Sequence, residues 1–196
     1  MRKLFWQMNV TLDGFMEGPN RELTYTAEFH DPDFDRYASE MLNSIGGMLL
    51  GRVTYEMFAG YWPSAKGPDA DQMNRLPKLV FSRTLKKLDW GNSKLVNGNI
   101  GEEVTRLKQQ PGKDLALFGS ANLAATLIQL GLIDEYRVLV TPVILGVGTP
   151  MFQTIDTTLN LKLVKATTWS SGTVALRYEP AAKRMGLAPL GMTREC

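Results

Sequence analysis

The chain has 196 residues, of which 44% are hydrophobic and 21% are charged, and its formal net charge is +2. This composition suits one globular domain with a sizeable core, and it lacks the basic excess typical of nucleic-acid-binding proteins. The single cysteine, Cys196, excludes an intrachain disulfide and a cysteine-based metal cluster, and it fits a reducing compartment. With a single histidine, His30, we expect no metal site of the zinc type.

No stretch of the sequence predicts a membrane segment. The first residues, 1–9, begin with basic side chains but lack a long apolar core, so they do not read as a signal peptide. No apolar run approaches the roughly 20 residues that a membrane-spanning helix needs. We therefore expect a cytoplasmic protein that works on a small molecule, without nucleic-acid or membrane partners.

The N-terminal part of the chain predicts a strand followed by an unusual loop. Residues 3–10 have the composition of a first strand, and residues 11–20 contain two glycines and a proline. Phe15 and Met16 place apolar side chains at the tip of this loop. Two interpretations stay open, which are a plain connection and a flap over a ligand.

The next segment predicts an amphipathic helix that begins near Asp31-Pro32-Asp33. Its apolar residues recur three or four positions apart, as on one helix face; they are Phe34, Tyr37, Ala38, Met41, Leu42 and Ile45. At about 100° per residue, Asp35 falls at the margin of this face, whereas Asp33 falls on the far side. We expect Asp35 to be the half-buried acid, and a solvated carboxylate is the alternative.

Three short apolar segments then run into polar turns. Residues 47–50 lead into Gly51 and a helix, residues 78–81 lead into Ser82-Arg83-Thr84, and residues 115–118 lead into Gly119-Ser120 and a helix that Gly131 ends. Ser120 is expected to cap its helix. Ligands of open α/β sheets bind beyond such strand ends, and helix N-termini favour phosphate. Ordinary strand-to-helix junctions are the alternative.

The C-terminal part predicts further strands and a tail. Residues 136–144 are β-branched and apolar, but Pro142 argues for an edge strand or a bulge. Residues 159–163 and 174–178 alternate apolar and polar side chains, which predicts an antiparallel hairpin. Gly146-Val147-Gly148 is no dinucleotide fingerprint, because the last glycine is missing and a proline follows. We assign residues 1–180 to one domain and expect residues 181–196 to form a partly disordered tail.

Taken together, these segments resemble the dihydrofolate-reductase-like family, specifically the group related to the C-terminal reductase domain of riboflavin-biosynthesis enzymes. The resemblance runs from about Lys3 to Tyr178, and its markers are residues 11–14, 50–56, 61–63, 78–84, 117–120, 132–136 and 142–148. It implies an α/β fold of three layers, in which helices flank a mixed, mostly parallel central sheet that ends in a C-terminal antiparallel hairpin.

The resemblance also implies an NADPH site in three parts. The pyrophosphate would be held by Gly51, Arg52, Thr54, Gly119, Ser120, Ala121 and Asn122. Ser82 and Arg83 would bind the 2′-phosphate of the adenosine. The nicotinamide would lie against Val10, Thr11, Leu12 and Gly14.

The implied activity is hydride transfer from NADPH to a C=N or C=O carbon of a small, pterin- or pyrimidine-like substrate. Asp35, or a water that it holds, would supply the proton. No set of basic residues for a phosphorylated ribose is evident in the sequence. A non-enzymatic NADPH- or ligand-binding protein is the alternative, and in either case we expect a homodimer paired near residues 136–144 or through the C-terminal hairpin.

Overall fold

The computed structural model describes residues 1–23, 25, 31–152, 155 and 158–181. The expectations for His30, for Cys196 and for all but the first residue of the tail 181–196 therefore lie outside the described residues. Among the described residues, no helix is long and apolar enough to cross a membrane.

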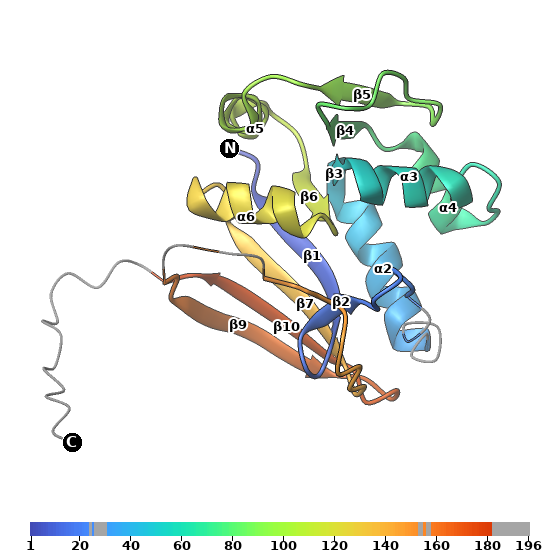
Figure 1. Ribbon diagram of the computed structural model, residues 1–196, viewed down its shortest axis with the longest axis vertical. Helices are drawn as coiled ribbons and strands as arrows, with labels where there is room; N and C mark the ends of the chain where they lie inside the picture. Colours follow the sequence, from blue (N-terminus) through green and yellow to red (C-terminus); the bar gives the residue numbers. More distant parts are fainter. Residues whose placement is uncertain (24, 26–30, 153–154, 156–157, 182–196) are drawn as a thin grey trace, which may run out of the picture.

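The molecule is built on one twisted sheet of eight strands in the order β5-β4-β3-β6-β1-β7-β10-β9 (Figure 1). The six strands from β5 to β7 run parallel, β10 pairs antiparallel to β7, and the edge strand β9 pairs antiparallel to β10. The strands are β1 (Leu4–Thr11), β3 (Ile45–Gly51), β4 (Lys78–Phe81), β5 (Ser93–Val96), β6 (Asp114–Phe118), β7 (Glu135–Thr141), β9 (Leu161–Thr168) and β10 (Val174–Pro180). The predicted α/β class, the mostly parallel sheet and the C-terminal hairpin are confirmed.

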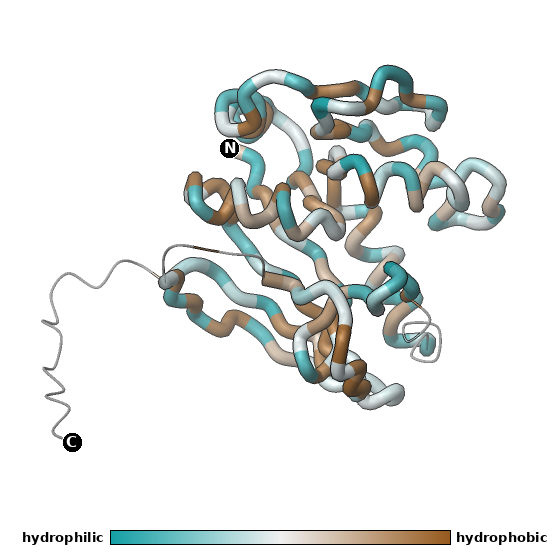
Figure 2. Tube along the Cα trace, viewed as in Figure 1, coloured by the Kyte–Doolittle hydropathy of each residue, from teal (hydrophilic) through white to brown (hydrophobic). Residues whose placement is uncertain are grey.

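Helices cover both faces of this sheet. The helices are α2 (Pro32–Ser44), α3 (Arg52–Tyr61), α4 (Pro68–Arg75), α5 (Ile100–Gln109) and α6 (Ala121–Gln129). Side chains alternate along β1, so that Trp6 joins the core beneath α5 and α6, whereas Phe5 joins the core beneath α2, α3 and α4. Figure 2 shows hydrophobic residues interspersed with hydrophilic ones along the strands and helices. Burying a large apolar side chain completely stabilises the folded state by roughly 1.5–3 kcal/mol. The packing in these two cores therefore stabilises the strand order that positions the cavity described below.

The start of helix α2 follows the expected pattern. The carboxylate of Asp31 accepts a hydrogen bond of 2.8 Å from the backbone N–H of Phe34, and Pro32 occupies the first helical turn. The same carboxylate accepts from the N–H of Ser171 in the turn between β9 and β10. These hydrogen bonds, the one from Phe34 first, lower the pKa of Asp31 to about 2. The cap therefore also ties α2 to the C-terminal hairpin.

One expectation about the sheet is wrong. The strand around residues 136–144 is not an edge, because β7 lies between β1 and β10. The strand ends at Thr141, so Pro142 stands just beyond it and removes no hydrogen bond from the ladder. The edge on this side of the sheet is β9.

A second, two-stranded sheet closes over the C-terminal end of β1. It consists of β2 (Phe15–Glu17) and β8 (Thr149–Pro150), which pair antiparallel. The predicted loop 11–20 thus contains a short strand. Its partner comes from a distant part of the chain, where Thr149 lies opposite Glu17.

Candidate functional site

A cavity of about 1220 Å³ lies along the C-terminal ends of the parallel strands. Its walls come from the strand ends at Gly51, Phe81, Val96 and Phe118, from the first turns of α3 and α6, and from α2 and β2. In open α/β sheets this is the place where ligands bind. The sheet, and not any single loop, determines the shape of the cavity.

Most of the predicted site residues line this one cavity. They are Asp35, Gly51, Arg52, Thr54, Ser82, Arg83, Gly119, Ser120, Ala121 and Asn122. Segments from three strand ends, far apart in the sequence, are thus brought together. Their roles toward a ligand stay predictions.

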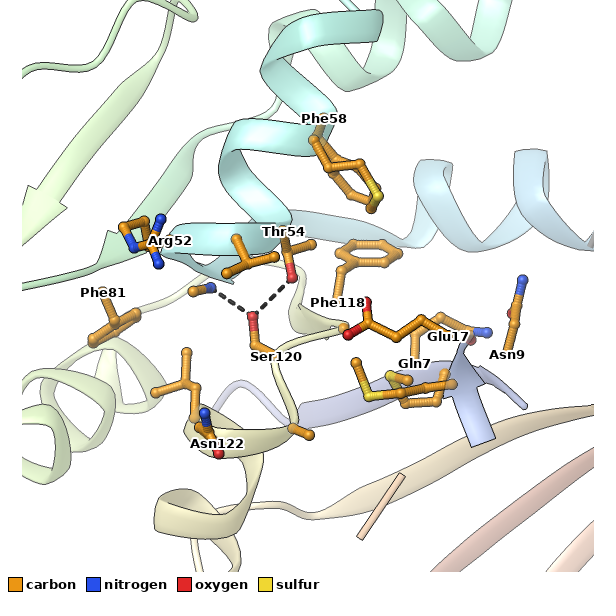
Figure 3. A pocket seen from close by; sticks show the side chains of 18 of the residues that line it. Gln7, Asn9, Glu17, Arg52, Thr54, Phe58, Phe81, Phe118, Ser120 and Asn122 are labelled. Carbon is orange, nitrogen blue, oxygen red and sulfur yellow. Dashed lines mark hydrogen bonds between the residues drawn. The ribbon is translucent and has the colours of Figure 1, made fainter. Parts of the chain in front are cut away.

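The hydroxyl of Ser120 connects two of the turns. Its Oγ accepts a hydrogen bond of 2.7 Å from the backbone N–H of Gly51 and lies 3.0 Å from Oγ1 of Thr54 (Figure 3). Ser120 stands at the N-cap position of α6, but it makes no capping hydrogen bond there. The expectation that Ser120 caps its own helix is therefore wrong. Its backbone is left-handed, with φ of 57°, and this turns the hydroxyl toward the start of α3.

Two glycines allow these turns to approach each other. A Cβ atom at Gly51 would lie 2.6 Å from Oγ of Ser120, and one at Gly119 would lie 2.7 Å from Oγ1 of Thr54. Gly119 also has a φ of 54°, which favours glycine. Only glycine, which has no side chain, fits at both positions. The first turns of α3 and α6 consequently face the same space, and N–H groups without intrahelical acceptors at helix starts favour anions.

Two cations stand near the same end of the cavity. Arg83 is exposed just beyond β4, in a turn where Oγ of Ser82 accepts hydrogen bonds from the N–H groups of Thr84 and Leu85. Arg52 is also exposed and pairs with Glu56 at 2.8 Å on the surface of α3. Among the described residues, no ion pair engages Arg83. Arg83 is thus the more available cation for an anionic ligand.

The residues predicted to face a nicotinamide do not line the cavity. Val10 and Thr11 are buried, and Leu12 is exposed. The Thr11 side chain holds the turn that follows β1, because its Oγ1 donates to Asp13 and accepts from the N–H of Phe15. Gly14 has a φ of 84° in the same turn. These residues direct the chain into β2, and a contact with a nicotinamide stays a prediction.

Asp35 lines the cavity from helix α2, but it is exposed. The half-buried acid of the first turn is Asp33, whose carboxylate accepts a hydrogen bond from the N–H of Ser170. The expectation that Asp35 is the half-buried one is wrong. The helix wheel placed Asp35 correctly beside the apolar face, but that margin faces the open cavity rather than the sheet.

Three further side chains that line the cavity were missed from the sequence. They are Gln7 on β1, Glu17 on β2 and Tyr37 on α2. The hydroxyl of Tyr37 donates to Oε1 of Gln7 at 2.5 Å, and burial raises the pKa of Tyr37 to about 12. The Glu17 carboxylate accepts a hydrogen bond of 2.9 Å from Oγ1 of Thr149. The polar position of Gln7 inside an apolar strand was the one available signal.

Comparison with known proteins agrees with this architecture. Residues 2–175 match the model of the RibD C-terminal domain, so the chain belongs to the RibD C-terminal domain family. The uncharacterized protein YyaP of Bacillus subtilis (strain 168) is 40% identical over 182 residues, which cover 90% of this chain and 94% of YyaP. The uncharacterized protein YwjB of the same organism is 27% identical over 177 residues, covering 90% and 97%.

Solved structures share the fold. A putative riboflavin biosynthesis protein from Shewanella sp. PV-4 superposes with a TM-score of 0.76 at 20% identity, covering 93% of this chain and 100% of that one. The dihydrofolate reductase from Enterococcus faecalis, solved with NADP(H), gives 0.62 at 14% identity, covering 92% and 97%. The Thermotoga maritima deaminase/5-amino-6-(5-phosphoribosylamino)uracil reductase gives 0.67 at 13% identity, covering 92% of this chain and 57% of that one. The fold is therefore dihydrofolate-reductase-like, and family and fold together support a reductase family.

Proposed function

We propose that this protein is an NADPH-dependent reductase that transfers a hydride to a C=N or C=O carbon of a small, pterin- or pyrimidine-like molecule. The observation that carries the proposal is the pair of turns at Gly51 and Gly119. They are held together through Ser120 and leave the N–H groups of two helix starts facing one cavity. Such an arrangement suits a pyrophosphate, because it gathers hydrogen-bond donors and positive dipole ends at one point.

The residues present fit NADPH. Gly51 and Gly119 provide space where a Cβ would collide with the facing turn, and the first turns of α3 and α6 would hold the pyrophosphate. Ser82 and Arg83 would bind the 2′-phosphate, since a guanidinium forms charge-assisted hydrogen bonds with it. NADPH would supply the hydride, and the protein would supply binding, orientation and electrostatics.

The substrate would occupy the other end of the cavity. Gln7, Asn9 and Glu17 provide polar groups there, and apolar side chains such as Met16 and Phe118 complete the wall. A cavity with apolar walls and a few polar groups is typical of sites for small heterocycles. Asp35 lines the same cavity and would hold the water that supplies the proton. The single cysteine fits a cytoplasmic enzyme.

One observation favours a second candidate function, namely NADPH or ligand binding without catalysis. Asp35 is exposed, so the proposed proton donor is open to solvent and is not a half-buried carboxylate. A protein that retained the cofactor end of the cavity and lost the acid would have this arrangement.

Mixing the purified protein with NADPH and single candidate substrates separates the two functions. The panel contains oxidised and dihydro pterins, aminopyrimidines and small carbonyl compounds, and the loss of NADPH absorbance is followed. Oxidation that depends on one of these compounds supports the reductase, and Asp35→Asn should then lower the turnover number without changing NADPH affinity. Tight NADPH binding without oxidation supports the binding protein, and no NADPH binding contradicts both.

We further propose a homodimer that pairs through β9. This strand forms one edge of the sheet, and it leaves Leu163 49% and Val164 45% exposed. An edge strand with exposed apolar side chains is a natural place for another chain to pair. Light scattering at micromolar concentration tests the proposal, since wild type should have the mass of two chains and Val164→Lys should shift it toward one.

A further inference from the structure

A second, smaller cavity of about 400 Å³ lies between helix α2 and the C-terminal hairpin. Its walls come from one side of α2, from β7, β10 and β9, which lie side by side at one end of the sheet (Figure 1), and from the turn at Trp169. The volume falls within the roughly 300–1,000 Å³ that is usual for sites of small molecules. None of the residues predicted for NADPH or for proton transfer lines this cavity.

Three cations of this second cavity stand in one row across the strands. Arg137 on β7 lies directly opposite Arg177 on β10, and Arg177 lies directly opposite Lys165 on β9. Residues in such positions point to the same face of the sheet, and neighbouring strands are only about 4.8 Å apart. Like charges placed directly opposite each other are destabilising. The row therefore favours a negatively charged group close to it.

The protein supplies one such group beneath the row. The carboxylate of Glu135 accepts from Nε of Arg137 at 2.5 Å through one oxygen, and from the guanidinium of Arg177 at 2.5 Å through the other. Both oxygens of this acid are thus engaged. Lys165 is exposed, and among the described residues no acid forms an ion pair with it. One carboxylate consequently faces three cations.

The facing wall on α2 does not neutralise the row. Asp33 and Arg36 form an ion pair with each other, and Glu40 is the remaining acid of this wall. Four cations and three acids therefore line or underlie the cavity, which leaves a net charge of +1. In addition, Nε of Arg177 is buried without a hydrogen-bond partner among the described residues, although a buried N–H without an acceptor is costly. Arg177 is an incompletely satisfied cation.

The next row along the same strands is uncharged. Leu139 lies opposite Ala175, and Ala175 lies opposite Thr167, so two small side chains stand beside the cations. The rings of Tyr37 and Trp169, with centroids 5.5 Å apart, contribute an aromatic wall. The second cavity thus combines a cationic row with an apolar and aromatic surface.

We propose that this second cavity binds a small organic anion, either a carboxylate or a phosphate ester with an apolar body. Its charged group would contact Arg177 and Lys165, since guanidinium and ammonium groups form charge-assisted hydrogen bonds with both kinds of anion. Its apolar body would lie over Leu139 and Ala175, beside Trp169. This binding needs neither NADPH nor a substrate in the first cavity, so the inference goes beyond the proposed function.

The test uses three probes that carry the same ring, namely benzoate, phenyl phosphate and benzamide. Benzamide matches benzoate in size and shape but has no charge. Protein labelled with ¹⁵N is titrated at pH 7 and at about 0.15 M salt, where distant charges are screened. The indole N–H signal of Trp169 reports the second cavity, and the backbone N–H signal of Gly119 reports the first.

Both anions should shift the Trp169 signal and bind at least about tenfold more tightly than benzamide, because benzamide lacks the charge-assisted hydrogen bonds. The order of the two anions then identifies the ligand class. Tighter binding of benzoate indicates carboxylates, and tighter binding of phenyl phosphate indicates phosphate esters.

The decisive variants remove the cations one at a time. Arg177→Gln should weaken both anions by about 10- to 100-fold, and Lys165→Gln, at an exposed position, by about 3- to 10-fold. Neither should change the affinity for benzamide. Lys162→Gln is the matched control, since Lys162 is an exposed lysine of the same strand that lies outside the cavity lining. It should leave all three affinities unchanged.

Three results would overturn the inference. They are equal affinities for benzoate and benzamide, equal effects of Lys165→Gln and Lys162→Gln, and a shift of the Gly119 signal without a shift of the Trp169 signal, which would place the anions in the first cavity only. If Arg177→Gln unfolds because Glu135 loses a partner, Lys165→Gln gives the decision. NADPH affinity should equal that of wild type in every variant. Failure of wild type to bind NADPH would contradict the proposed function and would leave this inference standing.

Discussion

The two ends of the cavity are built in different ways. The end that we propose for the phosphates, which we call the phosphate end, consists of the turns at Gly51, Ser82 and Gly119, residues that end a strand or directly follow one. The opposite end, which we call the substrate end, joins Gln7 of β1, Glu17 of β2 and a helix face of α2, and it depends on Thr149, 132 residues from Glu17. The phosphate end is a set of local motifs. The substrate end exists only after distant segments have paired.

This difference should show in the response to mutation, and the largest effect is expected at Gly119. In Gly119→Val, the new Cβ would lie 2.7 Å from Oγ1 of Thr54, in a left-handed backbone with φ of 54°. Strain and overpacking together cost roughly 2–5 kcal/mol. We expect NADPH to bind about 100-fold more weakly, while pterin binding without NADPH stays within about threefold of wild type. Fluorescence titration with each ligand measures both.

Gly60→Ala is the control for this variant. Gly60 lies in α3, and a Cβ there would meet no atom within 4 Å. Its ligand affinities should match those of wild type. If Gly119→Val weakened pterin as much as NADPH, the two ends would not be independent, and the comparison between them would fail.

The phosphate end could be predicted from the sequence because each of its parts is a strand followed by a glycine or a hydroxyl residue. The strand β4 was predicted with its exact bounds, and Arg83 was placed beyond it. The capping role of Ser120 was predicted wrongly, since its hydroxyl accepts a hydrogen bond from Gly51, 69 residues away, and sequence spacing carries no information about such a contact. The edge position assigned to residues 136–144 was also wrong. Pro142 indicated an edge only if it lay inside the strand, but the strand ends at Thr141, and sequence alone does not give that last residue.

The substrate end was predicted poorly for the same physical reason. Glu17 follows an apolar pair in a glycine-rich loop, and nothing local indicates that Thr149 will stand opposite it. The helix wheel gave Asp35 a margin position, but burial depends on what packs against that margin. In the fold this margin faces an open cavity, so Asp35 is the exposed acid and Asp33 is the half-buried one, which is the reverse of the prediction.

The second largest effect is expected at Arg83. Arg83→Ala should weaken NADPH by about 10- to 100-fold and leave NADH nearly unchanged, because NADH lacks the 2′-phosphate. The salt dependence of NADPH binding should become flatter as well. Titration of both cofactors at several ionic strengths checks these outcomes.

Arg52→Ala is the companion variant. Arg52 is paired with Glu56 on the helix surface, and such exposed pairs contribute little, so it can still turn toward the ligand. The double mutant shows whether the two arginines share one phosphate. Equal weakening of NADPH and NADH by Arg83→Ala would contradict the 2′-phosphate assignment.

A smaller effect is expected at Ser120. Ser120→Ala removes the acceptor for the N–H of Gly51 and the contact with Thr54, so the two turns are no longer tied. The loss of one hydrogen bond should cost about 1 kcal/mol of stability and weaken NADPH by about 3- to 10-fold. Thermal unfolding and cofactor titration measure the two quantities. Ser64→Ala, which removes an exposed hydroxyl that donates only to the carbonyl of Tyr61, should change neither.

The smallest effect on ligand binding is expected at Lys78, beneath the phosphate end at the start of β4. Its ammonium group is buried, donates to the backbone carbonyls of Asn74, Leu76 and Gly91, and lies 4.1 Å from the centre of the Trp90 ring. Burial lowers the pKa of Lys78 to about 8, from 10.5 in the unfolded chain. The folded state therefore releases the proton at a lower pH than the unfolded state does.

Between pH 8 and 10.5 the unfolded chain thus binds more protons at this residue than the folded protein, so the free energy of unfolding rises with pH in this window. Buried tyrosines act in the opposite direction only above pH 10, because burial raises the pKa of Tyr25 and Tyr136 to about 12. From pH 8 to 9.5 we expect wild type to gain up to about 2 kcal/mol relative to Lys78→Met. Urea unfolding at several pH values measures this difference, with NADPH and pterin affinities at pH 7 expected to be the same in both proteins. A parallel pH dependence of the two proteins would show that Lys78 keeps its proton through the window, held by the three carbonyls.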